Sequence, residues 1–148
     1  MADLKDVRRI ALGLPETSER PQWGNASWRV RNKPFVWERP LRPADLRALG
    51  DAAPDGPILG VRVEHVGAKE AMIADDPSVY FTTPHFDGYA AVLVRLDEIA
   101  LDELKEVVAE AWLCQAPKRL ANEFLESRGL PESDSPTAPD SSERKRSR

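Results

Sequence analysis

The pattern of apolar and polar residues along the chain switches between helical and strand periodicity. Leu104, Val107 and Val108 recur at the spacing of one helix face, whereas Val92 and Val94 alternate with other residues as in a strand. In chain order, the predicted elements are a helix over 3–13, strands over 27–31 and 34–39, a short helix over 43–49, a strand over 58–64, a helix over 67–76, strands over 78–83 and 89–96, and helices over 101–115 and 118–127.

The order of these elements favours an α+β fold. Several consecutive strands are joined by short connections, which is typical of hairpins in an antiparallel sheet. We therefore expect a mainly antiparallel β-sheet with helices packed on one face. The first hairpin is expected to turn at Asn32-Lys33, where the asparagine tolerates a positive φ, and the polar segment 15–25 is expected to be a loop.

The length of 148 residues and an apolar content of 41% indicate one globular domain. We place this domain at residues 1–130, because residues 131–148 contain no large apolar side chain and are expected to form a disordered polar tail. The N-terminal residues form no apolar signal segment, and no apolar run is long enough to cross a membrane. We therefore expect a cytoplasmic protein without a membrane partner.

The formal net charge of −4 weighs against avid binding to nucleic acid. Proteins of that class usually present a basic domain to the phosphate backbone. The tail balances its own charges, so the predicted domain carries the whole negative charge. A local basic patch is still compatible with this composition.

Three segments, in this order, resemble the MmcQ/YjbR family. The first is ALGLPETSERPQWGNASWRV, in which a helix ends in Leu-Pro and a polar loop leads into a strand. The second is ADDPSVYFTTPHFDGYAAVLVRLDE, with a Pro-His-aromatic element before a strand, and the third is AWLCQAPKRL. The resemblance spans roughly Leu4 to Leu120.

This resemblance implies a compact α+β fold similar to the CyaY/frataxin arrangement. It also implies DNA binding through a double wing of hairpins, and it supplies no catalytic residues. Residues 39–57 depart from the family pattern, because they form an enlarged connection that could cover or extend a binding surface.

The first candidate site is a basic hairpin that carries Arg29, Arg31 and Lys33. Arg29 and Arg31 are expected on one strand face, with Lys33 at the turn, so that their side chains could contact DNA phosphates. The alternative is an ordinary solvated strand face, because sheets direct polar residues outward.

The second candidate is the start of the last helix, where Lys118 and Arg119 follow a proline. Two cations together with free helix N–H groups could bind an anion or a DNA phosphate. The alternative is that Arg119 pairs with an acid such as Asp97 or Glu98.

The third candidate is a cleft lined by Trp23, His85 and Arg95. Together with Lys118, it could bind a protein or a small anionic ligand, which is the alternative to DNA binding. His85 has no converging partner for catalysis, because the chain lacks a serine-nucleophile motif and Cys114 is expected to be buried. We therefore expect no enzymatic activity, no cofactor and no metal site.

A row of glutamates on the long helix, at Glu103, Glu106 and Glu110, raises a further metal hypothesis. Carboxylate oxygens are hard ligands that could hold iron. The intervening Lys105 and the outward spacing instead favour a solvated helix face.

Overall fold

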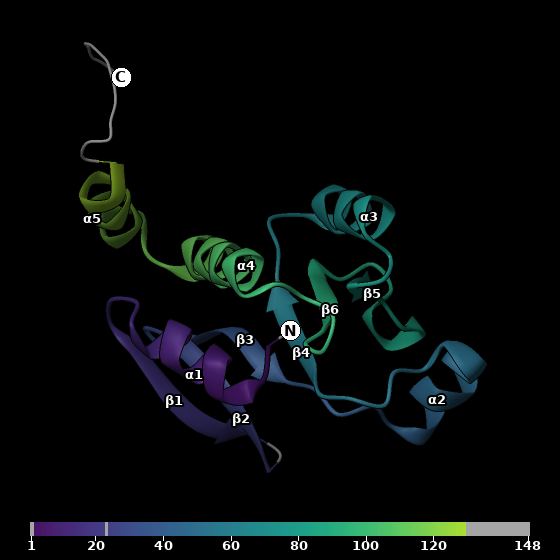
Figure 1. Cartoon of the computed structure of the whole chain (residues 1–148). Coiled ribbons are helices and arrows are strands. Elements are labelled where there is room, and N and C mark those ends of the chain that lie inside the picture. The colour runs from purple at the N-terminus through teal and green to yellow at the C-terminus, as the bar shows by residue number, and fades with distance from the viewer. Residues whose placement is uncertain (1, 23, 130–148) are drawn as a thin grey trace. The chain divides into compact units, whose positions relative to one another are not determined.

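The structure is a computed structural model that describes residues 2–22 and 24–129 (Figure 1). Residues up to Ala116 form one compact unit, and a second unit begins at Pro117 and contains helix α5 (Lys118–Gly129). The domain boundary at residue 130 stays a prediction. The polar tail at 131–148 lies outside the described residues.

The compact unit is built on a six-stranded sheet in which every neighbouring pair is antiparallel. The spatial order of the strands is β1-β2-β3-β4-β6-β5. Their bounds are β1 Thr17–Gln22, β2 Asn25–Val30, β3 Lys33–Glu38, β4 Ile58–Arg62, β5 Tyr80–Phe81 and β6 Ala91–Arg95. The mainly antiparallel α+β fold expected from the sequence is thereby confirmed.

Four α-helices of this unit accompany the sheet, together with two short 3₁₀ turns. Helix α4 contacts β2, β3 and β4, and α1 packs against both α4 and the β1–β2 pair (Figure 1). The bounds are α1 Leu4–Leu12, α2 Pro43–Leu49, η1 Gly50–Ala52, α3 Val66–Asp75, η2 Pro84–Phe86 and α4 Leu101–Gln115. No helix in the described part of the chain has the length and apolar character needed to cross a bilayer.

One face of the sheet forms the main core. Directly opposed residues of neighbouring strands share a face, and this face carries the buried row Trp28, Val36, Val61 and Val92. The fully buried indole of Trp112 on α4 completes this core. Its Nε1 donates a hydrogen bond to the Pro15 carbonyl at 3.0 Å, which fixes the chain as it leaves α1.

The opposite face of the sheet is also covered. The adjacent row of strand positions carries Trp37, Gly60, Leu93 and Phe81. Phe86 of η2 packs into this second cluster, and so do Leu41 and Leu49 from the enlarged connection between β3 and β4. The 39–57 segment therefore covers one end of this sheet face.

A buried lysine holds the segment that follows η2. Lys69 of α3 is only 4% exposed, and its Nζ donates to the carbonyls of Phe86 at 2.6 Å and Tyr89 at 3.1 Å. Burial lowers the pKa of Lys69, even though the carboxylates of Asp87 and Glu70 oppose this effect. The His85-containing turn is thus anchored from a helix that is distant in sequence.

The loop expected at 15–25 was wrong, because Thr17–Gln22 forms strand β1. This strand pairs with β2 alone and lies at the edge of the sheet. Its central residues Ser18, Glu19 and Arg20 are exposed, so it has no apolar alternation to reveal it. An edge position also tolerates Pro21, which cannot donate a ladder hydrogen bond.

The first hairpin turns one residue earlier than expected. Arg31 and Asn32 occupy the turn with φ values of 50° and 75°, and β3 already begins at Lys33. Two consecutive positive φ values are typical of a type I′ turn, whose twist matches the flanking strands. Arg31 therefore leaves the strand and does not share a strand face with Arg29.

Candidate binding pocket

A half-open pocket of about 490 Å³ lies between the β2–β3 hairpin, the start of the 39–57 connection and η2. Its apolar lining comes from Ala26, Pro34, Trp37, Leu41 and Phe86. Its polar lining includes Glu38, Arg39, Arg42 and His85. A concave apolar surface with a few converging polar groups is the usual form of a small-ligand site.

The position of the Trp37 indole is set by a glycine on the next strand. Trp37 pairs directly with Gly60 of β4, and a Cβ atom placed on Gly60 would lie 2.3 Å from Trp37 Nε1. Only glycine at that position leaves room for the ring where it lies. The half-buried indole thus rests against β4 and also lines the pocket.

A buried ion pair supports the pocket from behind. The side chains of Arg39 and Asp45 are 8% and 4% exposed, and Arg39 Nη2 lies 3.1 Å from Asp45 Oδ2. Arg39 Nη1 donates to the Pro40 carbonyl at 2.5 Å, and its guanidinium lies over the Phe86 ring at 5.2 Å. Arg39 Nη2 nevertheless has no well-aligned hydrogen bond among the described residues, despite its proximity to Asp45.

Asp45 is held in its charged form. Burial acts to raise the pKa of this carboxyl, but the hydrogen bond from the Arg42 amide and the charge of Arg39 outweigh burial and lower the pKa. The Arg42 amide donates to Asp45 Oδ2 at 2.9 Å. Asp45 therefore compensates Arg39 and fixes the start of α2 at the same time.

The rim of the pocket carries polar side chains that are more exposed to solvent than the Arg39–Asp45 pair. Arg42 and His85 are exposed, and the edge of the His85 ring meets the Phe86 ring at a centroid distance of 5.0 Å. Glu38 Oε1 accepts a hydrogen bond from the Ala26 amide at 3.2 Å. No ion pair within the described residues involves the Arg42 guanidinium. The pocket thus has a cationic side at Arg42 and an anionic side at Glu38.

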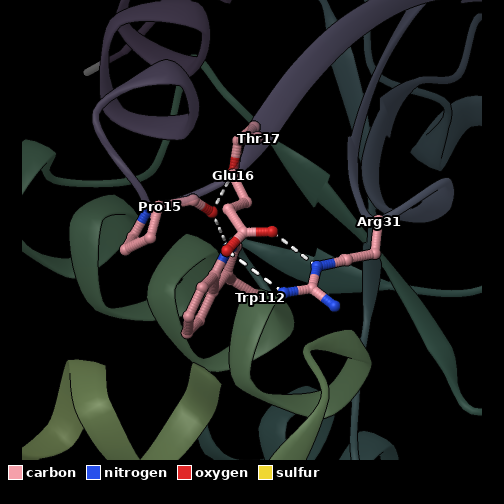
Figure 2. A network of polar contacts seen from close by, with 5 residues as sticks. All are labelled: Pro15, Glu16, Thr17, Arg31 and Trp112. Atoms are coloured by element: carbon pink, nitrogen blue, oxygen red, sulfur yellow. Dashed lines mark hydrogen bonds and ion pairs between the residues drawn. The ribbon is translucent and has the colours of Figure 1, made fainter. Parts of the chain in front are cut away.

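The predicted basic hairpin is partly compensated by acids. Figure 2 shows Arg31 facing Glu16, with Arg31 Nε 2.5 Å from Glu16 Oε1 and Nη2 3.2 Å from Oε2. The hydrogen bond from Arg31 lowers the pKa of Glu16. Arg29 is half-buried with its Nε 3.4 Å from Ser27 Oγ, and Lys33 is exposed beside the turn.

Lys118 and Arg119 lie in the first turn of α5, in the second unit, and both side chains are exposed. Arg119 Nε lies 3.5 Å from Glu123 Oε2, one helical turn away. A pair this exposed contributes little to stability. The alternative pairing of Arg119 with Asp97 or Glu98 stays a prediction. A joint site of Lys118 with His85 stays a prediction.

Among the pockets formed by the described residues, His85 and Arg95 line different ones, and a cleft shared by both stays a prediction. Arg95, at the end of β6, lies over the Phe81 ring at 4.3 Å and donates through Nη1 to the Pro77 carbonyl at 3.0 Å. The Arg95 guanidinium is held by Phe81 and Pro77, whereas the His85 ring contacts Phe86 of η2. Trp23 lies outside the described residues.

Three other residues with chemically reactive or metal-binding side chains, His65, Cys114 and Glu103, lie outside the candidate pocket. His65 begins helix α3, and its Nδ1 accepts a hydrogen bond from the Ala68 amide at 2.9 Å. Cys114 is exposed, contrary to the expectation of burial, and it lines a hollow together with Val61 of β4 and Met72 of α3. Glu103 accepts a hydrogen bond from the Tyr80 hydroxyl, which ties it to β5. Within residues 2–22 and 24–129, no cluster of three potential metal ligands occurs.

Sequence reasoning found His85 but missed the residues that make its surroundings a pocket. Trp37, Arg39 and Arg42 lie close together in sequence, at the end of β3 and in the connection to α2, and that proximity was the available signal. The pairing of Trp37 with Gly60 depends on strand register, which the residue pattern does not reveal.

Comparisons with known proteins identify relatives in sequence and in fold. A family model described as YjbR matches residues 12–114. The uncharacterised proteins Rv2570 of Mycobacterium tuberculosis and Mb2600 of Mycobacterium bovis are each 54% identical over 132 residues, which cover 87% of this chain and 100% of those proteins. A crystal structure of Deinococcus radiodurans protein DR2400, with a DUF419 domain, matches with a TM-score of 0.61 and 18% identity over 90% of this chain and 92% of that one. This structural likeness shows the fold alone.

Proposed function

The chain belongs to the YjbR family, and on this basis we propose that it is a small, cytoplasmic, non-enzymatic protein that binds a ligand in the pocket of Trp37, Arg42 and His85. The observation that carries the proposal is the convergence of three separate segments on one apolar hollow with charged groups at its rim. The alternative use of this surface, contact with a partner protein, would involve the same residues.

Contacts outside the pocket hold its walls in place. Gly60 and the Arg39–Asp45 pair fix two of these walls, and Lys69 anchors the segment that carries His85. Preorganised walls favour affinity, because less conformational entropy is lost when a ligand binds.

A fragment screen followed by amide and indole NMR signals tests this proposal. We expect a subset of small aromatic fragments to shift signals of residues 25–42 and 84–86. Pro34→Phe should abolish these shifts, because the new ring would enter the pocket from a half-buried position on the same sheet face as Trp37. Ser18→Phe, which adds the same ring at an exposed site on β1, is the matched control and should retain them. The absence of any pocket-directed fragment would contradict the proposal.

DNA binding is the second candidate, and the grouping of Arg29, Arg31 and Lys33 around one hairpin tip favours it. The pairing of Arg31 with Glu16 and the net charge of −4 oppose it. A double-wing mode would require these cations to neutralise several phosphates.

Fluorescence polarisation with random duplex DNA across a salt series separates the two candidates. Electrostatic binding would give an association constant that falls by roughly one logarithmic unit per phosphate contact for each tenfold increase in salt concentration. Arg29→Ala and Arg31→Ala would each reduce that slope if the hairpin contacts DNA. If no binding occurs at low salt, or if the slope is unchanged in both variants, the DNA hypothesis is wrong.

A further inference from the structure

We infer that the ligand of this pocket is a small molecule in which a planar aromatic ring is joined to one anionic group, a carboxylate or a phosphate. This inference rests on the proposed function and specifies the class of compound that the pocket takes.

The ring is recognised by Trp37. The indole lies against Gly60, where any Cβ atom would displace it, and it is half-exposed toward the pocket. Phe86 is a poorer platform, because the Arg39 guanidinium already covers its ring at 5.2 Å. Stacking on an indole whose position is fixed therefore provides the main contact for a flat ring.

The anionic group is recognised by Arg42. Its exposed guanidinium forms no ion pair within the described part of the chain, whereas the other arginine of the pocket, Arg39, is compensated by Asp45. A guanidinium can donate two parallel hydrogen bonds to a carboxylate or phosphate. His85 lines the same pocket and offers a further ring nitrogen.

The ligand carries its negative charge at one end only. Glu38 also lines the pocket, and its carboxylate accepts from the Ala26 amide. A second anionic group directed at Glu38 would meet a like charge, which is unfavourable in a partly desolvated site. The opposite end of the ligand is therefore neutral or carries a hydrogen-bond donor.

Two matched pairs of probes test the inference on the full-length protein by isothermal titration calorimetry. Naphthoate and naphthamide differ in the carboxylate charge, and adenosine monophosphate and adenosine differ in a phosphate. We expect the anion of at least one pair to bind about tenfold or more tightly than its neutral partner, which corresponds to about 1.4 kcal/mol. The pair with the larger difference identifies the anionic group.

Variants locate the recognition. Arg42→Ala should remove the difference within the pair, whereas Arg47→Ala, an exposed arginine of α2 outside the pocket lining, should retain it. Trp37→Leu should weaken the anion and the neutral partner by the same factor, about tenfold. Retention of the folded state in each variant is checked by circular dichroism.

The outcomes separate this inference from the proposed function. If each anion and its neutral partner bind equally, or if neither pair binds while other fragments occupy the pocket, the inference is wrong and the proposed function stands. If the difference survives Arg42→Ala, recognition of the anion by Arg42 is wrong. If no compound of any class binds in the pocket, both the inference and the proposed function fail.

Discussion

The contact between Trp37 and Gly60 makes a quantitative prediction for Gly60→Ala. The new Cβ would lie 2.3 Å from Trp37 Nε1 and 2.4 Å from Cε2, so the indole must move. Overpacking of this kind typically costs about 1–3 kcal/mol. Replacing a strand glycine by alanine should return about 0.4–1 kcal/mol, because the unfolded chain loses conformational freedom. We therefore expect a net destabilisation of up to about 2.6 kcal/mol, with about 1.3 kcal/mol at the middle of the range.

A double-mutant cycle in urea unfolding isolates this contact. In a Trp37→Ala background the added methyl group meets no ring, so Gly60→Ala should become neutral or slightly stabilising. The coupling energy between the two positions should then be about 1–3 kcal/mol. Equal effects of Gly60→Ala in both backgrounds would refute the contact.

Gly56→Ala is the matched control for the glycine substitution itself. A Cβ at Gly56 would lie 1.9 Å from Asp97 Oδ2, which is even closer than the contact at Gly60. The atom it meets is the end of an exposed, flexible carboxylate, which can rotate away. Gly56→Ala should therefore cost little, and a loss as large as that of Gly60→Ala would show that the cost does not come from the indole.

Three further variants test the support of the pocket and the hairpin. Asp45→Asn leaves the buried Arg39 guanidinium without its counter-charge, and we expect a loss of about 3–5 kcal/mol in urea unfolding. Because the pKa of folded Asp45 lies below its unfolded value, its stabilisation is complete above about pH 4 and is lost as pH falls through the folded pKa. As pH falls below about 4, the free energy of unfolding should therefore decrease more steeply in the wild type than in Asp45→Asn. Parallel curves for the two proteins would contradict this. Lys69→Met removes the hydrogen-bond donor to the carbonyls of Phe86 and Tyr89. The free energy of unfolding should therefore decrease by about 1–3 kcal/mol, and amide exchange in residues 84–90 should accelerate. Unchanged exchange there would show that Lys69 does not anchor the segment. Glu16→Gln should leave the unfolding free energy nearly unchanged, because the ion pair with Arg31 is exposed, and a marked loss would show a structural role for this pair.

Local signals in the sequence were sufficient for the helices. Helix α4 has the bounds expected from its apolar stripe, Leu101–Gln115. Helix α2 begins at Pro43, where a missing N–H costs nothing, and ends before Gly50, whose φ is 56°. These features act within a few residues, so the order of residues alone reveals them.

Features that depend on neighbours in space were harder to predict. Strand β1 lacks an apolar alternation because its consecutive central side chains, Ser18, Glu19 and Arg20, are all exposed, and its ladder with β2 is visible only once the fold is known. Arg31 was expected on a strand, yet the two-residue turn places it at a positive φ, where arginine has no particular preference.

The candidate site was predicted only in part for the same reason. His85 was identified from its residue type, and it does line a pocket. The residues around it were missed because contacts between distant parts of the chain create the site. The position of the Trp37 indole depends on its pairing with Gly60, and the charge of Arg39 is compensated by Asp45. Arg95, expected in the same cleft, lines another pocket because its guanidinium is held over Phe81.

The most direct test is an NMR titration of the full-length protein with naphthoate and, separately, with adenosine monophosphate, in which the indole N–H of Trp37 and the amides of residues 25–42 and 84–86 are followed. We predict that at least one of the two anions shifts these signals in a saturable manner, and that Arg42→Ala reduces the affinity for that anion by about tenfold. Saturable shifts confined to the hairpin tip around Arg31, to α5, or to a second hollow lined by Met72 of α3 and Leu113 of α4 would show that the pocket of Trp37 and Arg42 is not the binding site.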